Sequence, residues 1–169
     1  MTQAPASPRD ERGSGLVELL MVMTLMIFFG YTIYILIFTG SAALQRIDAQ
    51  RAAQADARIA LSYVNVRVRQ SDGARQIAVL PNGINGKPSL LLRYRQVDGA
   101  YDTWIFWFDG KLMEVLADAD ESPDWLGGDT IATIQGFTPA LNDGSLTNVI
   151  EYKYGEESRE VRQIISLRT

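Results

Sequence analysis

The stretch RGSGLVELLMVMTLMIFFGYTIYILIFTG, residues 12–40, decides the architecture of this chain. Its residues 19–38 hold no ionisable group except Tyr31 and Tyr34, and its single carboxylate, Glu18, stands at the start. About 20 apolar residues, each rising 1.5 Å along a helix, span roughly the 30 Å hydrocarbon core of a bilayer. A charge in that core costs about 2.5–3.5 kcal/mol on insertion scales, so Glu18 is expected to have a function.

The composition of the 169 residues leaves room for one domain plus an anchor, and it excludes several kinds of chemistry. The chain has no cysteine and no histidine, which rules out a disulfide scaffold, the usual zinc sites and a thiol nucleophile. It also lacks a Gly-x-Ser-x-Gly elbow, a Ser-x-x-Lys pair and a glycine-rich phosphate loop. An enzyme is therefore not expected.

The formal net charge of −4 hides an asymmetry along the chain. Residues 41–70 hold five arginines and two aspartates, a balance of +3. Residues 71–169 hold nine basic and fifteen acidic side chains, a balance of −6. An acidic domain repels phosphate backbones, so nucleic-acid binding by this second part is disfavoured.

The segment before the apolar run, MTQAPASPRDERG, does not fit a cleavable secretory signal. Such a signal has an apolar core of about 7–15 residues followed by a small-residue cleavage site, and here the run is longer with nothing like Ala-x-Ala after it. One interpretation is an uncleaved anchor. The chain would then be a single-pass, membrane-tethered module whose second part binds something outside the membrane.

The residues around Gly13 favour another interpretation. The order Arg12-Gly13, then Ser14, then Glu18 ahead of an unbroken apolar helix resembles the class III signal of type IV prepilins and pseudopilins. The resemblance implies that a prepilin peptidase cuts between Gly13 and Ser14, that the Ser14 amine is methylated, and that Glu18 is the fifth mature residue. A buried amine and a buried carboxylate are each costly alone, so Glu18 is expected to neutralise Ser14 of the next subunit.

The resemblance implies a structural subunit of a type IV pilus-like or pseudopilus filament, assembled with other pilin-like subunits by a membrane platform. Residues 1–13 would be a cytoplasmic leader, 14–40 the membrane and filament-core helix, 41–72 an amphipathic helix and 73–169 a β domain outside the cytoplasmic membrane and later on the cell surface. The chain departs from major pilins because it has no proline between residues 16 and 80 and no C-terminal disulfide loop, which favours a minor subunit. The stretch ALSYVNVRVRQSDGA resembles pilin-like proteins of Gram-positive bacteria and, more loosely, the minor pseudopilin with a large β domain.

Residues 41–72 show a helical period, and we expect one helix from about residue 16 to residue 70. The face predicted to pack on a sheet consists of residues at mostly three- and four-residue spacing: Leu44, Ile47, Ala52, Ala55, Ile59, Tyr63 and Val66. A lipid-surface helix is the rival interpretation, although a polar face of mixed sign and an alanine-rich apolar face disfavour it.

The remainder predicts an α+β fold with antiparallel strands. Strands are expected at residues 74–80, 89–96, 101–108, 111–116, 130–137, 146–154 and 159–167, in one sheet or in two layers. Asp109-Gly110 between two apolar runs is a strong hairpin signal. Bulky residues occupy both the even and the odd positions of 104–108, so they point to both faces of the strand. This pattern predicts a central strand that is covered on both faces, with the helix on one.

Two clusters in the β part are candidate binding sites. Residues 117–129 form an acidic loop whose carboxylates could hold calcium, although a solvated turn is the alternative; the candidate ligands are Asp118, Asp120, Asp124 and Asp129. The aromatic side chains could line a ligand groove, but their strand spacing favours core packing; these are Tyr101, Trp104, Phe106, Trp107, Phe108 and Trp125. No other cofactor is expected.

The proposed cleavage site makes one direct prediction. Gly13→Ala should strongly slow processing, because a peptidase fitted to glycine before the cut bond excludes a β-carbon there. Gly15→Ala is the matched control and should have a milder effect. The measurement is the fraction of processed chain in membranes that contain a prepilin peptidase, and full-rate cleavage of Gly13→Ala would contradict the prepilin interpretation.

Overall fold

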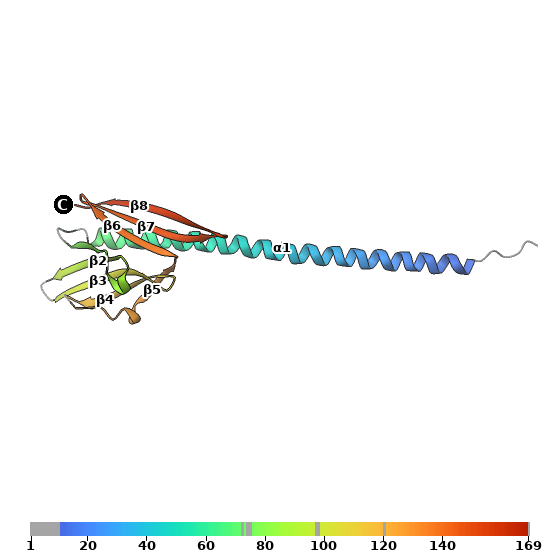
Figure 1. Cartoon of the computed structure of the whole chain (residues 1–169), viewed down its shortest axis with the longest axis horizontal. Coiled ribbons are helices and arrows are strands. Elements are labelled where there is room, and N and C mark those ends of the chain that lie inside the picture. Colours follow the sequence, from blue (N-terminus) through green and yellow to red (C-terminus); the bar gives the residue numbers. More distant parts are fainter. Residues whose placement is uncertain (1–10, 72, 74–75, 97–98, 120, 169) are drawn as a thin grey trace, which may run out of the picture. The chain divides into compact units, whose positions relative to one another are not determined.

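The structure is a computed structural model that describes residues 11–71, 73, 76–96, 99–119 and 121–168, with the backbone alone for residues 11–14 and 96. The chain divides into two compact units, Met1–Arg46 and Ile47–Thr169, and each is described by itself. The fold is α+β, as the sequence predicts: one long helix with an apolar N-terminal part, followed by antiparallel sheets (Figure 1).

The helix α1 runs from Glu11 to Gln70 without interruption. Its length follows from the absence of proline and from the many alanine, leucine, methionine and arginine residues, all good helix formers. The helix ends at Ser71, whose N–H bonds back to the carbonyls of Arg67 and Val68. Arg67 and Arg69 in the last turn complement the negative end of the helix dipole.

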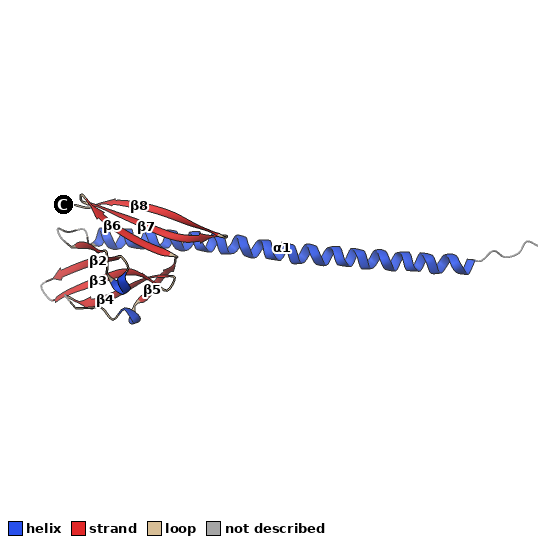
Figure 2. Cartoon of the chain, viewed as in Figure 1, coloured by secondary structure: helices blue, strands red, loops and turns tan. Residues whose placement is uncertain are grey.

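In the described part of the second unit, eight strands form two antiparallel sheets, seen as two groups of strands beside the end of α1 (Figure 2). The five-stranded sheet has the order β1-β2-β3-β4-β5, and the three-stranded sheet has the order β6-β7-β8. The strands are β1 (Ile77–Leu80), β2 (Ser89–Gln96), β3 (Gly99–Phe108), β4 (Lys111–Asp118), β5 (Asp129–Thr133), β6 (Gly136–Asn142), β7 (Ser145–Tyr154) and β8 (Glu157–Ser166). Two short 3-10 helices, η1 (Ile84–Gly86) and η2 (Trp125–Gly127), lie in the β1–β2 and β4–β5 connections.

The predicted meander β2-β3-β4 is confirmed, and β3 is the central strand of its sheet. Phe108 pairs with Lys111 across the turn at Asp109-Gly110. Both turn residues have positive φ, 45° for Asp109 and 75° for Gly110, as a tight two-residue hairpin requires. β3 begins at Gly99, two residues earlier than expected.

The prediction of a single strand at 130–137 is wrong. β5 ends at Thr133 in the five-stranded sheet, and β6 starts at Gly136 in the other sheet. The remainder of β6 was missed because Pro139, which cannot donate to a ladder, argues against a strand; β6 is an edge strand, where proline is tolerated. The hairpin that follows β6 has Asp143 and Gly144 at positive φ, the same signal that located the turn after β3.

The prediction of which helix face packs on the sheets is also wrong, because the buried positions lie one or two residues after the predicted ones. The buried residues of α1 are Ala57, Ala60, Val64 and Val68, whereas Ile59 and Val66 remain about half exposed. Leu44, Ile47, Ala52 and Ala55 are not buried either, and of the predicted face only Tyr63 packs against the core. The alanines fit several helical faces equally well, so periodicity alone could not choose. Small side chains on the true face let the sheets approach the helix closely.

The two faces of β3 are covered as predicted. Ile105 belongs to the main core, which joins the buried face of α1 to both sheets. Phe106 points to the other face and packs with Ile84 of η1 and with Met113 in a second, smaller core. The five-stranded sheet therefore lies between the helix on one side and the loop-borne η1 and η2 on the other.

We expect residues 41–169, expressed without the apolar stretch, to fold as a soluble acidic domain. Every buried residue of the main core lies between residues 57 and 165, so none of this core depends on the first unit. Near-ultraviolet circular dichroism and a cooperative urea transition would detect the fold. A fragment that remains unfolded or aggregated under all mild conditions would show that the core needs the preceding segment.

Candidate functional site

The first candidate site is the apolar surface of α1 in the first unit. All side chains of residues 15–38 are exposed, including every large aliphatic and aromatic one. Among the described residues, α1 is the one helix long and apolar enough to cross a membrane. A continuous apolar surface of this size marks contact with lipid or with other protein, because soluble monomers rarely expose more than a few hundred Å².

The hydroxyls of Thr24 and Thr32 on this surface are satisfied within the helix. Thr24 donates its hydroxyl to the carbonyl of Leu20 at 2.8 Å, and Thr32 donates to the carbonyl of Phe28 at 2.9 Å. Such back-bonding removes the need for an outside partner. Glu18 differs: its side chain is exposed, and no described residue forms a hydrogen bond or ion pair with it.

The predicted processing site lies at the start of the same helix. Gly13 and Ser14 belong to α1 by their backbone, which is all that the structure describes of them. Cleavage between them and methylation of Ser14 therefore stay predictions.

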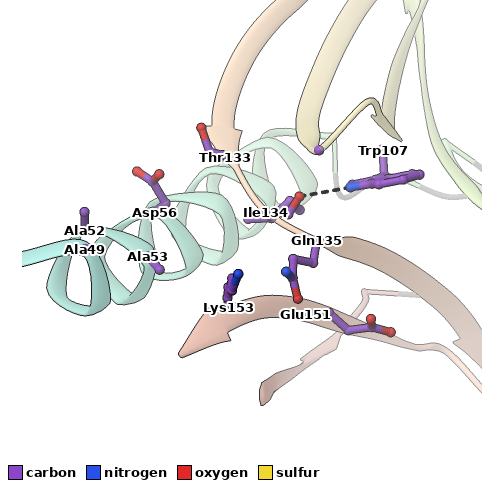
Figure 3. Close-up of a pocket in the computed structure, with 11 residues that line it drawn as sticks. Ala49, Ala52, Ala53, Asp56, Trp107, Thr133, Ile134, Gln135, Glu151 and Lys153 are labelled. Atoms are coloured by element: carbon purple, nitrogen blue, oxygen red, sulfur yellow. Dashed lines mark hydrogen bonds between the residues drawn. The ribbon is translucent and has the colours of Figure 1, made fainter. Parts of the chain in front are cut away.

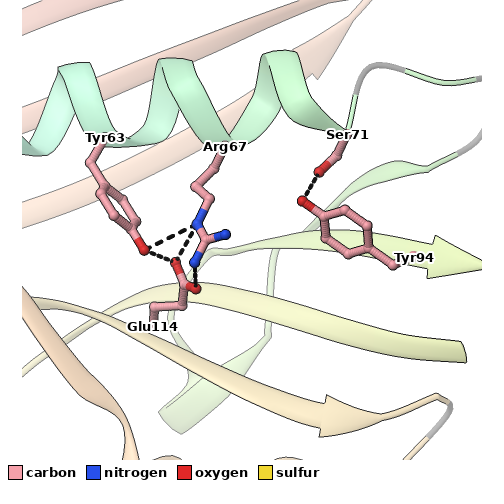
Figure 4. A network of polar contacts seen from close by, with 5 residues as sticks. All are labelled: Tyr63, Arg67, Ser71, Tyr94 and Glu114. Atoms are coloured by element: carbon pink, nitrogen blue, oxygen red, sulfur yellow. Dashed lines mark hydrogen bonds and ion pairs between the residues drawn. The ribbon is translucent and has the colours of Figure 1, made fainter.

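The second candidate site is a polar cluster that joins α1 to β4 (Figure 4). Tyr63 and Arg67 lie one helical turn apart, and both reach Glu114 of β4. The Tyr63 hydroxyl donates to the carboxylate, Arg67 forms an ion pair with it, and the Arg67 Nε also donates to the Tyr63 hydroxyl at 3.1 Å. Glu114 is only 13% exposed, so its charge depends on these two donors. Ser71 donates to the Tyr94 hydroxyl and adds a bond at the helix end.

The cluster changes the ionisation of its members. Burial, together with the hydrogen bond to Glu114, raises the pKa of Tyr63 above its ordinary value of 10.0, so the hydroxyl remains a donor at neutral pH. Burial lowers the pKa of Arg67, but the bond to Tyr63 and the charge of Glu114 outweigh this and leave the pKa raised. Both pKa values are raised, so Tyr63 and Arg67 keep the protons that they donate to Glu114. The cluster therefore acts as a structural clamp between α1 and β4.

The sequence contains one signal for this clamp, the position of Glu114 in its strand. In β4, Glu114 shares the helix-facing side with Leu112, since it pairs with the buried Ile105 of β3. A single carboxylate on a buried strand face requires a partner, and the Tyr63–Arg67 spacing on the facing helix supplies one.

A pocket of about 860 Å³ opens where the two sheets diverge beside α1 (Figure 3). The helix contributes a wall of small residues, Ala49, Ala52 and Ala53. Opposite them lie the linker between β5 and β6 and the charged side chains of β7, Glu151 and Lys153. Trp107 closes one side and donates its indole N–H to the carbonyl of Ile134 at 3.0 Å. The pocket is mainly apolar.

The acidic loop does not assemble a cation site from the residues that are described. No group of three or more carboxylates there lies close enough to hold a metal ion, and Asp120 lies outside the described residues. Asp118 ends β4, Asp129 begins β5, and Asp124 accepts a bond from the N–H of Leu126 at the start of η2. Asp124 therefore acts as the N-cap of η2.

The aromatic residues divide between core and surface. Phe106 is fully buried, and Trp107 packs against the main core, as their strand spacing favours. Trp104, Phe108 and Trp125 are only partly buried around the smaller core. Tyr101 stacks on Tyr94 at 4.9 Å between ring centres.

Comparison with known proteins places the second unit in a family. Residues 55–152 match the family described as "Domain of unknown function (DUF4860)", and because the match covers more than half of the chain, the chain belongs to this family. No curated protein and no solved structure matches the chain.

We expect Arg67→Met to destabilise the domain by about 2 kcal/mol, since a hydrogen bond to a charged group contributes about 1.5–3 kcal/mol. The substitution keeps most of the side-chain volume but leaves the Glu114 carboxylate with one donor fewer. Arg58→Met, at an exposed arginine of the same helix, is the matched control and should stay within about 0.5 kcal/mol of the parent. Urea unfolding measures both, and equal effects would contradict the clamp.

Proposed function

We propose that this DUF4860 protein is a non-catalytic structural subunit of a type IV pilus-like or pseudopilus filament. Two features support the proposal: the pilin-like architecture of a long apolar helix followed by antiparallel sheets, and the order Gly13-Ser14 … Glu18 at the head of that helix. In this role the second unit is carried outside the membrane, and the apolar part of α1 holds the subunit first in lipid and then in the filament.

One observation carries the proposal more than the others. The whole surface of residues 15–38 is exposed, mainly apolar and uncharged, apart from Glu18 at its start. Lipid could cover the apolar side chains, but lipid offers no partner for a carboxylate. A neighbouring helix of the same kind offers both an apolar surface and, after cleavage, a new positive amine at Ser14.

The pairing of Glu18 with Ser14 of the next subunit sets the axial register in this proposal. Both groups are buried once the helices associate, and each is strongly unfavourable without the other. Only one offset between neighbouring helices brings the amine and the carboxylate together. The charge is therefore retained because it selects that offset.

The partners follow from the same assignment. A prepilin peptidase removes residues 1–13, and a membrane platform adds the subunit to other pilin-like subunits. The chain has no cysteine and so cannot form the C-terminal disulfide loop of major pilins, which favours a minor subunit of the filament.

Glu18→Val tests this proposal. Cleavage and membrane insertion should be intact, because neither needs the carboxylate, but co-assembly should fall a hundredfold or more, since losing one partner of a buried pair costs about 3–5 kcal/mol. Glu18→Asp, with its shorter reach, should be intermediate. Because the chain has no cysteine, single engineered cysteines on α1 report subunit contacts by crosslinking in cells that carry the assembly machine.

Thr24→Val is the matched control for this experiment. It also removes a polar group from the apolar helix, but one whose hydrogen bond is made within the helix. It should assemble like the parent. Normal crosslinking of Glu18→Val would show that the carboxylate does not select the register.

A further inference from the structure

The part of α1 that packs on the sheets leaves its opposite side uncovered. On that side, exposed residues recur at spacings of three, four and seven positions, which places them on one helical face. All of them lie in the second unit. We call this surface the arginine face, and its members are Arg51, Arg58, Ile59, Ser62, Val66 and Arg69.

The positive charge of the arginine face is not balanced within the chain. Its three arginines are exposed, and none of them forms an ion pair with a described residue. The Nε of Arg69 donates to Asn65 at 3.0 Å, but this partner is neutral. Residues 47–70 contain two carboxylates: Asp48 precedes the face, and Asp56 lines the large pocket instead.

Apolar side chains accompany these arginines. Ile59 is 51% and Val66 50% exposed, whereas Val64 and Val68 on the opposite side of the helix are fully buried. Protein interfaces combine apolar side chains with a polar margin, and arginine is enriched in them. The arginine face therefore has the composition of a docking surface for an acidic protein partner.

The connection between β4 and β5 has the complementary composition. The chain contains no lysine or arginine from residue 112 to residue 152. Leu126, in η2 of this connection, is 73% exposed. Four carboxylates of the connection and its ends are exposed and form no ion pair with a described residue; these are Asp118, Glu121, Asp124 and Asp129.

We propose that the arginine face of one subunit docks the β4–β5 connection of a second copy of this chain. In this contact the arginines face the carboxylates of the connection, and Leu126 packs on Ile59 and Val66. Each surface thereby gains the charge partners that its own chain does not provide.

The inference rests on the proposed filament, because the two docking surfaces differ. A contact between unlike surfaces can repeat from copy to copy and build an open helical array, as a filament requires. A symmetric pairing of two arginine faces would instead bring like charges together, which is unfavourable. The contact needs two adjacent copies, so a subunit present once, at a filament tip, could not form it.

Engineered cysteines test the contact, because the chain has none of its own. Ser62→Cys on the arginine face and Leu126→Cys in the connection are placed in separate full-length chains and co-expressed in cells that carry the assembly machine. We expect a disulfide-linked dimer of the two different chains, and no dimer when either variant is present alone. A single chain with both substitutions should form a ladder of larger multimers.

Charge reversal then identifies the interaction. Arg51→Glu with Arg58→Glu, in the Ser62→Cys chain, should reduce the dimer at least about tenfold, because juxtaposed like charges are strongly unfavourable. Asp118→Lys with Glu121→Lys, in the Leu126→Cys chain, should restore the dimer when the two reversed chains are combined.

The matched control changes the same number of charges outside both surfaces. Arg159→Glu with Arg162→Glu, at exposed positions of β8, should leave the yield of the dimer unchanged when placed in the Ser62→Cys chain. A dimer of two Ser62→Cys chains, or a loss that the reversed connection does not restore, would overturn the proposal. If crosslinks between the apolar segments of α1 form without this dimer, the docking is wrong and the filament stands; if neither forms, both proposals fail.

Discussion

The exposure of the apolar residues 15–38 is the constraint on which the rest of the structure depends. No described residue of the first unit buries these side chains, and water is an unfavourable environment for all of them. The segment therefore requires lipid or other helices to cover its apolar side chains, or first lipid and then other helices. Within that segment the two threonines bond their own hydroxyl groups to the helix backbone, and Glu18 is the one charged group. In the proposed filament, one neighbouring helix meets both requirements. Its apolar surface covers the side chains of residues 15–38, and its new N-terminal amine pairs with the Glu18 carboxylate.

In the second unit, the C-terminal part of α1 packs against two sheets. The buried face of α1 is formed by Ala57, Ala60, Val64 and Val68, so the sheets can approach closely, but small side chains provide limited apolar area. The ion pair and hydrogen bonds around Glu114 add a specific contact at this boundary. The other face of the five-stranded sheet is covered by the connections that carry η1 and η2.

Much of this architecture follows from local sequence patterns. The helix, the α+β class and the meander around β3 were predicted because proline-free runs, alternation and an Asp-Gly turn act over a few residues. The failures have a different origin. The buried face of α1 could not be chosen because alanine is compatible with any face, and β6 was hidden because Pro139 argues locally against a strand that the partner strand β7 nonetheless pairs. The clamp at Glu114 arises from contacts between segments that are distant in sequence, which no local pattern contains.

Intact mass spectrometry of the chain extracted from membranes with and without a prepilin peptidase tests the central claim most directly. The filament proposal predicts that, with the peptidase present, the chain begins at Ser14 and carries a methyl group on its amine, and that without the peptidase it retains residues 1–13. A chain that keeps its leader in both membranes would contradict the proposal. The protein would then be a permanent single-pass tether for its second unit, and Glu18 would have no amine to neutralise.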